Sequence, residues 1–100
     1  MGLDVYLEDE FGEELDSSLD EGGVLAAAWP TGNSAYPMLR YVDSEGATTF
    51  NRLQLEAVLP ELESFEKASA PAVKPFAARA VRLARKAAAE PHLYLRFLGD

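Results

Sequence analysis

The chain has 100 residues, no cysteine and a formal net charge of −8 at pH 7. Its length and its 48% hydrophobic content suit one domain with a single core. Without cysteine there are no disulfides, no thiolate nucleophile and no cysteine-ligated zinc or iron–sulfur site. The net negative charge disfavours nucleic acid and anionic membranes as partners.

The first part of the chain contains an alternating segment and then an acidic one. Apolar side chains at Leu3, Val5 and Leu7 alternate with other residues, which predicts a strand over about 3–8. The acidic segment at about 8–22 is expected to be loop-like because glycine and serine interrupt it, although Phe11 and Leu15 have the spacing of one helical turn.

The next part of the chain is expected to contribute three more strands. Residues 24–29 are predicted to form a strand that ends at Pro30. Residues 37–42 and 47–50 are predicted to form a hairpin around the turn at 43–46.

The second half contains two helical patterns and a last strand. Asn51 and Gln54 resemble a capping box, and a helix is predicted over about 52–66, with a break or kink near 58–60 because of Pro60. A second helix is predicted over about 72–89, with Pro75 in its first turn, followed by an alternating strand at the end of the chain. The fold class expected is α+β, with a mainly antiparallel sheet of four to five strands and the two helices on one face.

Sequence motifs for metal binding and catalysis are incomplete. A calcium loop counted from Asp16 would need glycine at its sixth position and glutamate at its twelfth, where Glu21 and Ala27 stand. The single histidine, His92, has no evident catalytic partner, and neither a nucleophile elbow nor a phosphate-binding loop is present. We therefore predict no catalytic residue, no metal ligand and no cofactor.

The charges are unevenly distributed along the chain. Residues 1–22 contain nine acidic residues and no basic one, whereas residues 23–100 contain eight acidic and nine basic residues, so the two parts carry −9 and +1. Such a segment would accelerate association with a cationic protein. The acids predicted to bind a basic protein partner are Glu8, Asp9, Glu10, Glu13, Glu14, Asp16, Asp20 and Glu21.

Basic residues gather in the second predicted helix, which has no acid between 72 and 89; they are Lys74, Arg79, Arg82, Arg85 and Lys86. Their spacing puts Arg79, Arg82 and Lys86 on one face. We interpret this face as the solvated side of an amphipathic helix rather than as an anion or nucleic-acid contact, because the whole chain is acidic.

Two other functions remain open at this stage. A small-molecule-binding protein or minor enzyme would have a pocket between helices and sheet near Trp29, Tyr41, His92 and Arg96. A homodimer joined through a strand edge or a helix face is also conceivable.

Two segments of the sequence resemble those of bacterial proteins, and this resemblance implies no activity. The pairing of TTFNRLQLEAVLPELE (48–63) with PHLYLRFLGD (91–100) resembles a group of short uncharacterised bacterial proteins, which implies no cofactor or site residue. In size and charge the chain is similar to immunity proteins of bacterial toxin systems. We expect a cytoplasmic protein, since no targeting segment or membrane-spanning run is evident.

Overall fold

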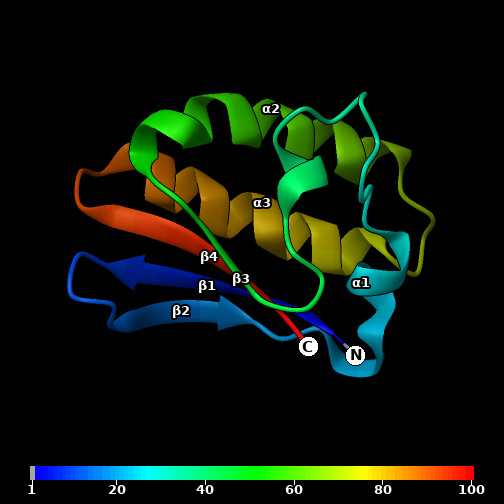
Figure 1. Ribbon diagram of the computed structural model, residues 1–100, viewed down its shortest axis with the longest axis horizontal. Coiled ribbons are helices and arrows are strands. Elements are labelled where there is room, and N and C mark those ends of the chain that lie inside the picture. The colour runs from blue at the N-terminus through cyan, green and yellow to red at the C-terminus, as the bar shows by residue number, and fades with distance from the viewer. Residues whose placement is uncertain (1) are drawn as a thin grey trace.

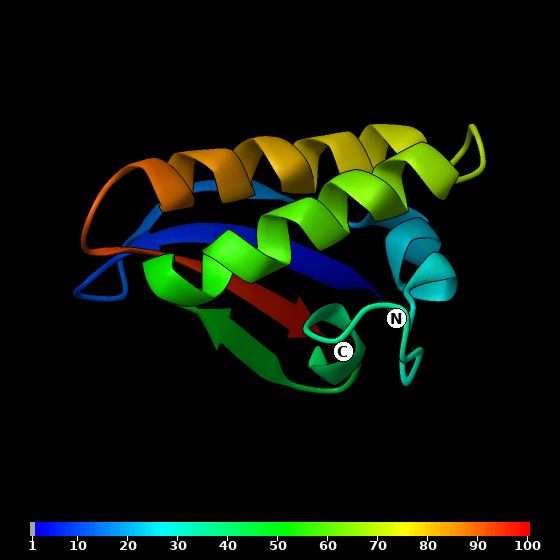
Figure 2. The same cartoon turned by 90° about the horizontal axis from the view of Figure 1, so that it is seen from above.

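The computed structural model describes residues 2–100 as a four-stranded antiparallel sheet covered on one face by two long helices (Figures 1 and 2). The sheet order is β2-β1-β4-β3. The α+β class and the two helices on one face are confirmed. In chain order the elements are β1 (Leu3–Asp9), β2 (Glu14–Ser18), the 3-10 turn η1 (Glu21–Gly23), α1 (Val24–Ala28), the 3-10 turn η2 (Leu39–Tyr41), β3 (Ala47–Phe50), α2 (Arg52–Ala68), α3 (Lys74–Ala89) and β4 (Leu93–Gly99).

The first and last strands form the centre of the sheet. β1 and β4 pair from Leu3 opposite Gly99 to Asp9 opposite Leu93. The alternation read from the sequence decides which side chains face the helices, because neighbouring residues of a strand point to opposite faces. Leu3, Val5 and Leu7 of β1 are buried, as are Leu95 and Phe97 of β4. The two strands thus form the side of the hydrophobic core that faces the helices.

Helix α2 begins with the predicted cap and does not stop at its proline. The Asn51 side chain accepts a hydrogen bond from the Gln54 N–H, and the Gln54 side chain accepts one from the Asn51 N–H, both at 2.9 Å. The predicted break at 58–60 is wrong, because α2 continues through Pro60 to Ala68. Burial of the apolar stripe holds the helix across the missing hydrogen bond; its buried members are Leu55, Val58, Leu62 and Phe65.

Helix α3 lies beside α2 and over the sheet (Figure 2), and the side chains that it buries there are mostly small. Pro75 lies in its first turn, where the missing N–H costs least. Alanines line its inner side and let the helix backbone approach its neighbours closely; the buried residues are Ala77, Ala80, Val81, Leu83, Ala84 and Ala87.

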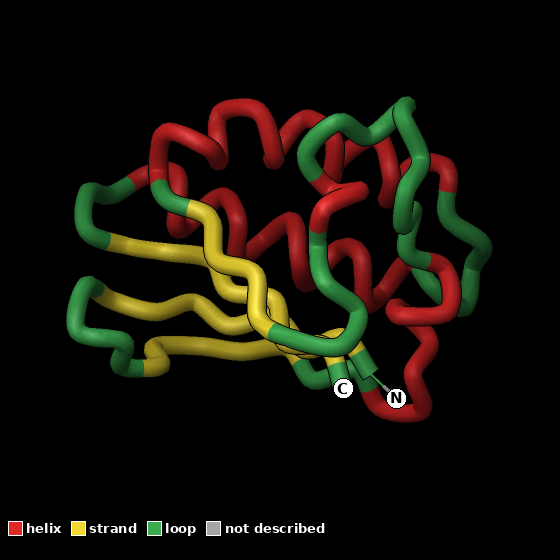
Figure 3. Tube along the Cα trace, in the orientation of Figure 1, coloured by secondary structure: helices red, strands yellow, loops and turns green. Residues whose placement is uncertain are grey.

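Three predictions for the first half are wrong. The segment expected to be a loop at 8–22 contains β2, which pairs with β1. Residues 24–29 form the short helix α1, in keeping with the helix preference of alanine. Residues 37–42 form a turn around η2 in the long connection of Figure 3, because the Glu61 carboxylate accepts hydrogen bonds from the N–H groups of Met38 and Leu39. β3 consequently pairs with β4.

No helix among residues 2–100 has the length and apolar character needed to cross a membrane.

Substitution of Pro60 by alanine tests the account of α2. Pro60 is exposed, so its loss removes little buried surface, while alanine restores a helical hydrogen bond and relieves the clash with the preceding turn. We expect P60A to raise the free energy of unfolding by about 1–3 kcal/mol in urea titrations. Ser64→Ala, at an exposed position of the same helix, should change it by only about 0.5 kcal/mol. A destabilised P60A would contradict the account.

Candidate functional site

The acidic segment forms a hairpin with an ordered tip. At the tip the Asp9 carboxylate accepts hydrogen bonds from the N–H groups of Phe11 and Glu13, both at 2.9 Å. The Asp9 N–H donates to the Glu13 carbonyl at 3.0 Å, and Gly12 adopts a positive φ of 80° that suits glycine. Local hydrogen bonds therefore fix the tip without any core contact.

The two apolar side chains of this hairpin face solvent. Phe11 at the tip is 86% exposed and Leu15 is 52% exposed. Leu15 lies at a β-bulge, where the register passes from Leu7 opposite Asp16 to Glu8 opposite Glu14. The helical turn considered for Phe11 and Leu15 is absent. Main-chain pairing orders the segment and leaves an aromatic ring exposed among carboxylates.

Glu8 is neutralised by a basic residue of the neighbouring strand. Its carboxylate lies 2.8 Å from Arg96 Nε on the sheet face away from the helices, and the Arg96 guanidinium carbon lies 4.8 Å from the centroid of the Tyr6 ring. Both charged side chains are largely shielded from solvent. Glu8 therefore forms an ion pair within the sheet and does not contribute a free charge to the acidic surface.

Asp20 is buried and ties the start of β1 to the start of α1. Its carboxylate accepts hydrogen bonds from the backbone N–H groups of Leu3 at 3.0 Å, Leu25 at 2.8 Å and Ala26 at 2.9 Å. The carboxylate thereby satisfies N–H groups in the first turn of α1 that have no partner within the helix. Asp20 stabilises the fold and is not accessible to a partner.

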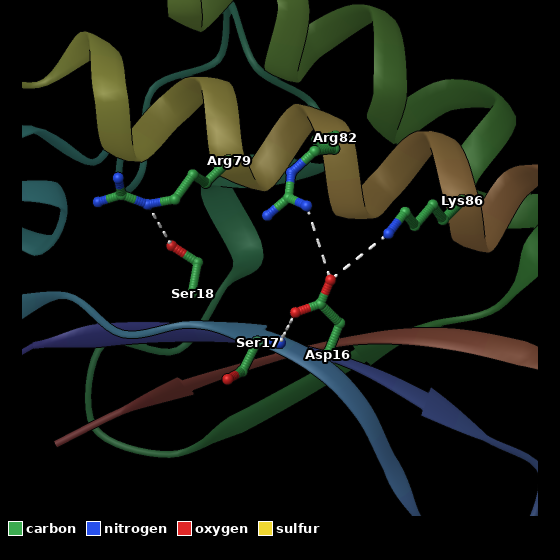
Figure 4. A network of polar contacts seen from close by, with 6 residues as sticks. All are labelled: Asp16, Ser17, Ser18, Arg79, Arg82 and Lys86. Carbon is green, nitrogen blue, oxygen red and sulfur yellow. Dashed lines mark hydrogen bonds and ion pairs between the residues drawn. The ribbon is translucent and has the colours of Figure 1, made fainter.

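Asp16 points toward the basic face of α3 (Figure 4). Its carboxylate lies 3.7 Å from Arg82 Nη1 and 3.5 Å from Lys86 Nζ, and it accepts a hydrogen bond from the Ser17 N–H at 2.8 Å. The Ser17 hydrogen bond first, and then Lys86, hold the pKa of Asp16 below its ordinary value of 3.8. The basic face predicted to be merely solvated thus meets an acid of the hairpin.

The remaining acids lie on the surface of the hairpin and of the turn that follows it. Glu10 Oε2 is 3.4 Å from Nδ1 of His92, which has a positive φ of 66° in the α3–β4 connection. Glu13, Glu14 and Glu21 are exposed, and no side-chain hydrogen bond or ion pair of theirs occurs within residues 2–100. The exposed acidic surface is therefore centred on Glu10, Glu13 and Glu14, around Phe11; we call these four residues the hairpin tip surface.

The four residues considered for a ligand pocket lie apart. Trp29 is buried, donates to the Leu39 carbonyl at 2.9 Å and packs on other rings of the core. Tyr41 is exposed beside Arg40, His92 lies in the α3–β4 connection beside the hairpin tip, and Arg96 is on the outer sheet face. They do not line one cavity. Among the described residues, no group of acidic or histidine side chains is arranged to hold a metal ion.

Sequence reasoning missed the exposed Phe11. Its spacing from Leu15 suggested a shared buried face, whereas Asp9 followed by Gly12 three residues later is a common β-turn pattern. That pattern would have placed Phe11 at the tip of a hairpin.

Comparison of the chain with protein-family models, with curated proteins and with solved structures finds no match. The resemblance to short bacterial proteins stays a prediction, and the function has to be argued from the geometry of this chain.

Replacement of Asp20 tests its role in the fold. Asp20→Ala leaves buried N–H groups of Leu3 and Leu25 without an acceptor, so we expect the free energy of unfolding to fall by about 3 kcal/mol. Glu13→Gln, an exposed position nearby, should change it by less than about 0.5 kcal/mol. Equal effects of the two substitutions in urea titrations would contradict the assignment.

The pKa of Asp16 predicts a pH dependence. Because the pKa of Asp16 is lowered in the folded state, the charged carboxylate stabilises the fold at pH values above its ordinary pKa of 3.8. This stabilisation is lost as the pH falls through the pKa of the folded state. The stability difference between wild type and Asp16→Asn should therefore shrink between about pH 6 and about pH 3 in urea titrations. Glu14→Gln, on the same strand but exposed, provides the control. A difference that stays constant over this range would be inconsistent with the lowered pKa.

Proposed function

We propose that this chain is a small acidic protein-binding domain, an immunity-type or regulatory partner of a basic protein, acting in the cytoplasm. The observation that carries the proposal is the exposed ring of Phe11 on a hydrogen-bonded turn, with the exposed acids Glu10, Glu13 and Glu14 near it in the same hairpin. Binding energy at protein interfaces is concentrated in a few anchors, often aromatic, while surrounding charges set orientation and association rate.

The fixed tip favours this function over that of a solvated loop. A ring held on an ordered turn loses little conformational entropy when it inserts into a pocket of a partner. Four of the eight acids expected to bind a partner are engaged within the fold, namely Glu8, Asp9, Asp16 and Asp20. Glu10 remains on the surface although it lies 3.4 Å from His92. The proposed contact consequently narrows from the whole segment to the hairpin tip surface.

The alternative of a small-molecule-binding protein receives no support from the four residues that suggested it, since they occupy different parts of the fold. The tip surface, in contrast, requires no rearrangement to meet a partner.

Site-specific photo-crosslinking in cells that produce the protein tests the proposal. A photoreactive phenylalanine analogue at position 11 should crosslink to one basic protein. The same analogue at position 53, where Leu53 is 67% exposed on α2, should not capture that protein. Equal crosslinking from both positions, or none from position 11, would rule out the tip as the contact.

Binding kinetics with the captured protein separate the contribution of the Phe11 ring from that of the acidic side chains. Phe11→Ala should weaken binding about tenfold or more, mainly through faster dissociation. Glu13→Lys with Glu14→Lys should slow association about tenfold at low salt, and Glu45→Lys with Glu56→Lys, an equal charge change at exposed sites elsewhere, should slow it much less. An association rate that ignores ionic strength would contradict electrostatic steering.

A further inference from the structure

A groove of about 430 Å³ lies between the outer strand β2 and helix α3, away from the hairpin tip surface. It is lined by Ser17, Ser18, Leu19, Glu21, Phe76 and Arg79. Leu19 is 52% exposed and Phe76 is half-buried, so both polar and apolar atoms face the groove. This composition is typical of sites that orient a small ligand group.

Arg79 is held in place at the groove but is not neutralised. Its Nε donates to the Ser18 hydroxyl at 3.1 Å, and its guanidinium carbon lies 4.7 Å from the centroid of the Phe76 ring. Figure 4 shows this guanidinium directed away from Asp16. In the part of the chain that the structure describes, its terminal nitrogens have no hydrogen bond and no carboxylate within ion-pair distance. A guanidinium fixed by its inner nitrogen presents its outer donors to a ligand.

The neighbouring cations make this side of α3 locally positive. Arg82 and Lys86 share the single carboxylate of Asp16, at distances longer than those of a tight ion pair. Charges beyond about 8–10 Å are largely screened at physiological ionic strength, so the acidic hairpin tip contributes little to the field in the groove. An anion can therefore be attracted to this groove although the whole chain is acidic.

We propose that the groove binds a carboxylate attached to a short apolar group, with Arg79 as the residue that pairs with the carboxylate. The flat fork of outer guanidinium donors matches the two oxygens of a carboxylate. Leu19 and Phe76, which line the groove beside Arg79, contact the apolar part. Glu21 on the groove wall repels a second negative charge and so favours a carboxylate over a phosphate dianion.

Two kinds of ligand contain a carboxylate attached to a short apolar group: a free organic acid and the C-terminus of a peptide. The proposal is independent of the hairpin tip, because no residue of the groove belongs to that surface.

A ligand titration of the intact chain tests the proposal, with the NMR signal of the Arg79 Nε–Hε group as the readout. N-acetyl-leucine and hexanoate should each give a saturable shift in the millimolar range, as expected of one ion pair with one apolar contact. Tighter binding of N-acetyl-leucine would indicate that the groove takes a peptide C-terminus. Tighter binding of hexanoate would indicate that it takes a free organic acid. N-acetyl-leucinamide, which lacks the charge, and inorganic phosphate should bind about tenfold more weakly or not at all.

Variants distinguish a site from a general charge effect. Arg79→Gln should abolish binding, and Arg79→Lys should weaken it about tenfold because the fork is lost while the charge remains. Glu21→Gln should tighten binding several-fold, since the repelling charge is gone. Arg52→Gln, which removes one positive charge at the start of α2, should have no effect.

Three outcomes would overturn the proposal. They are the absence of a saturable shift up to roughly 50 mM ligand, equal shifts from the acid and the amide, and equal losses in Arg79→Gln and Arg52→Gln. If Glu21→Gln left the affinity unchanged, the assigned preference for a single negative charge would also be wrong.

Discussion

The antiparallel pairing of β1 with β4 is the constraint on which the rest of the structure depends. It joins the two ends of the described chain in the centre of the sheet and leaves β2 and β3 as the edges. The acidic residues that follow β1 must then return along an edge strand, on the side covered by α3. Pairing of the chain ends thus places the most acidic segment beside the most basic helix.

This arrangement divides the acidic segment by role. Three of its acids are used internally: Glu8 pairs with Arg96, Asp16 faces Arg82 and Lys86, and Asp20 caps backbone groups. Exposed ion pairs such as those of Asp16 each contribute no more than about 1 kcal/mol, so they orient the hairpin more than they stabilise it. The acids around Phe11 remain on the surface, where they can act on another molecule.

The sequence was sufficient for the elements with strong periodicity. The alternation in β1 and β4 appears as predicted, because it reports directly which side chains are buried, and the capping box of α2 appears because Asn51 and Gln54 form it locally. It was insufficient where tertiary contacts decide. The Glu61 carboxylate takes the N–H groups that a strand at 37–42 would need, and β2 is held by pairing although its sequence is largely polar. Arg79 could be placed on a helix face from its spacing, but the groove beside it depends on β2.

The central claim is that the acidic segment is an ordered hairpin and not a solvated loop. Backbone 15N relaxation of residues 9–18 tests it most directly. Order parameters of about 0.85, equal to those of β1 and β4, are predicted for the amides of Phe11 and Glu13, whose N–H groups bond to Asp9. Values below about 0.6 over these residues would show a flexible segment and would contradict the account.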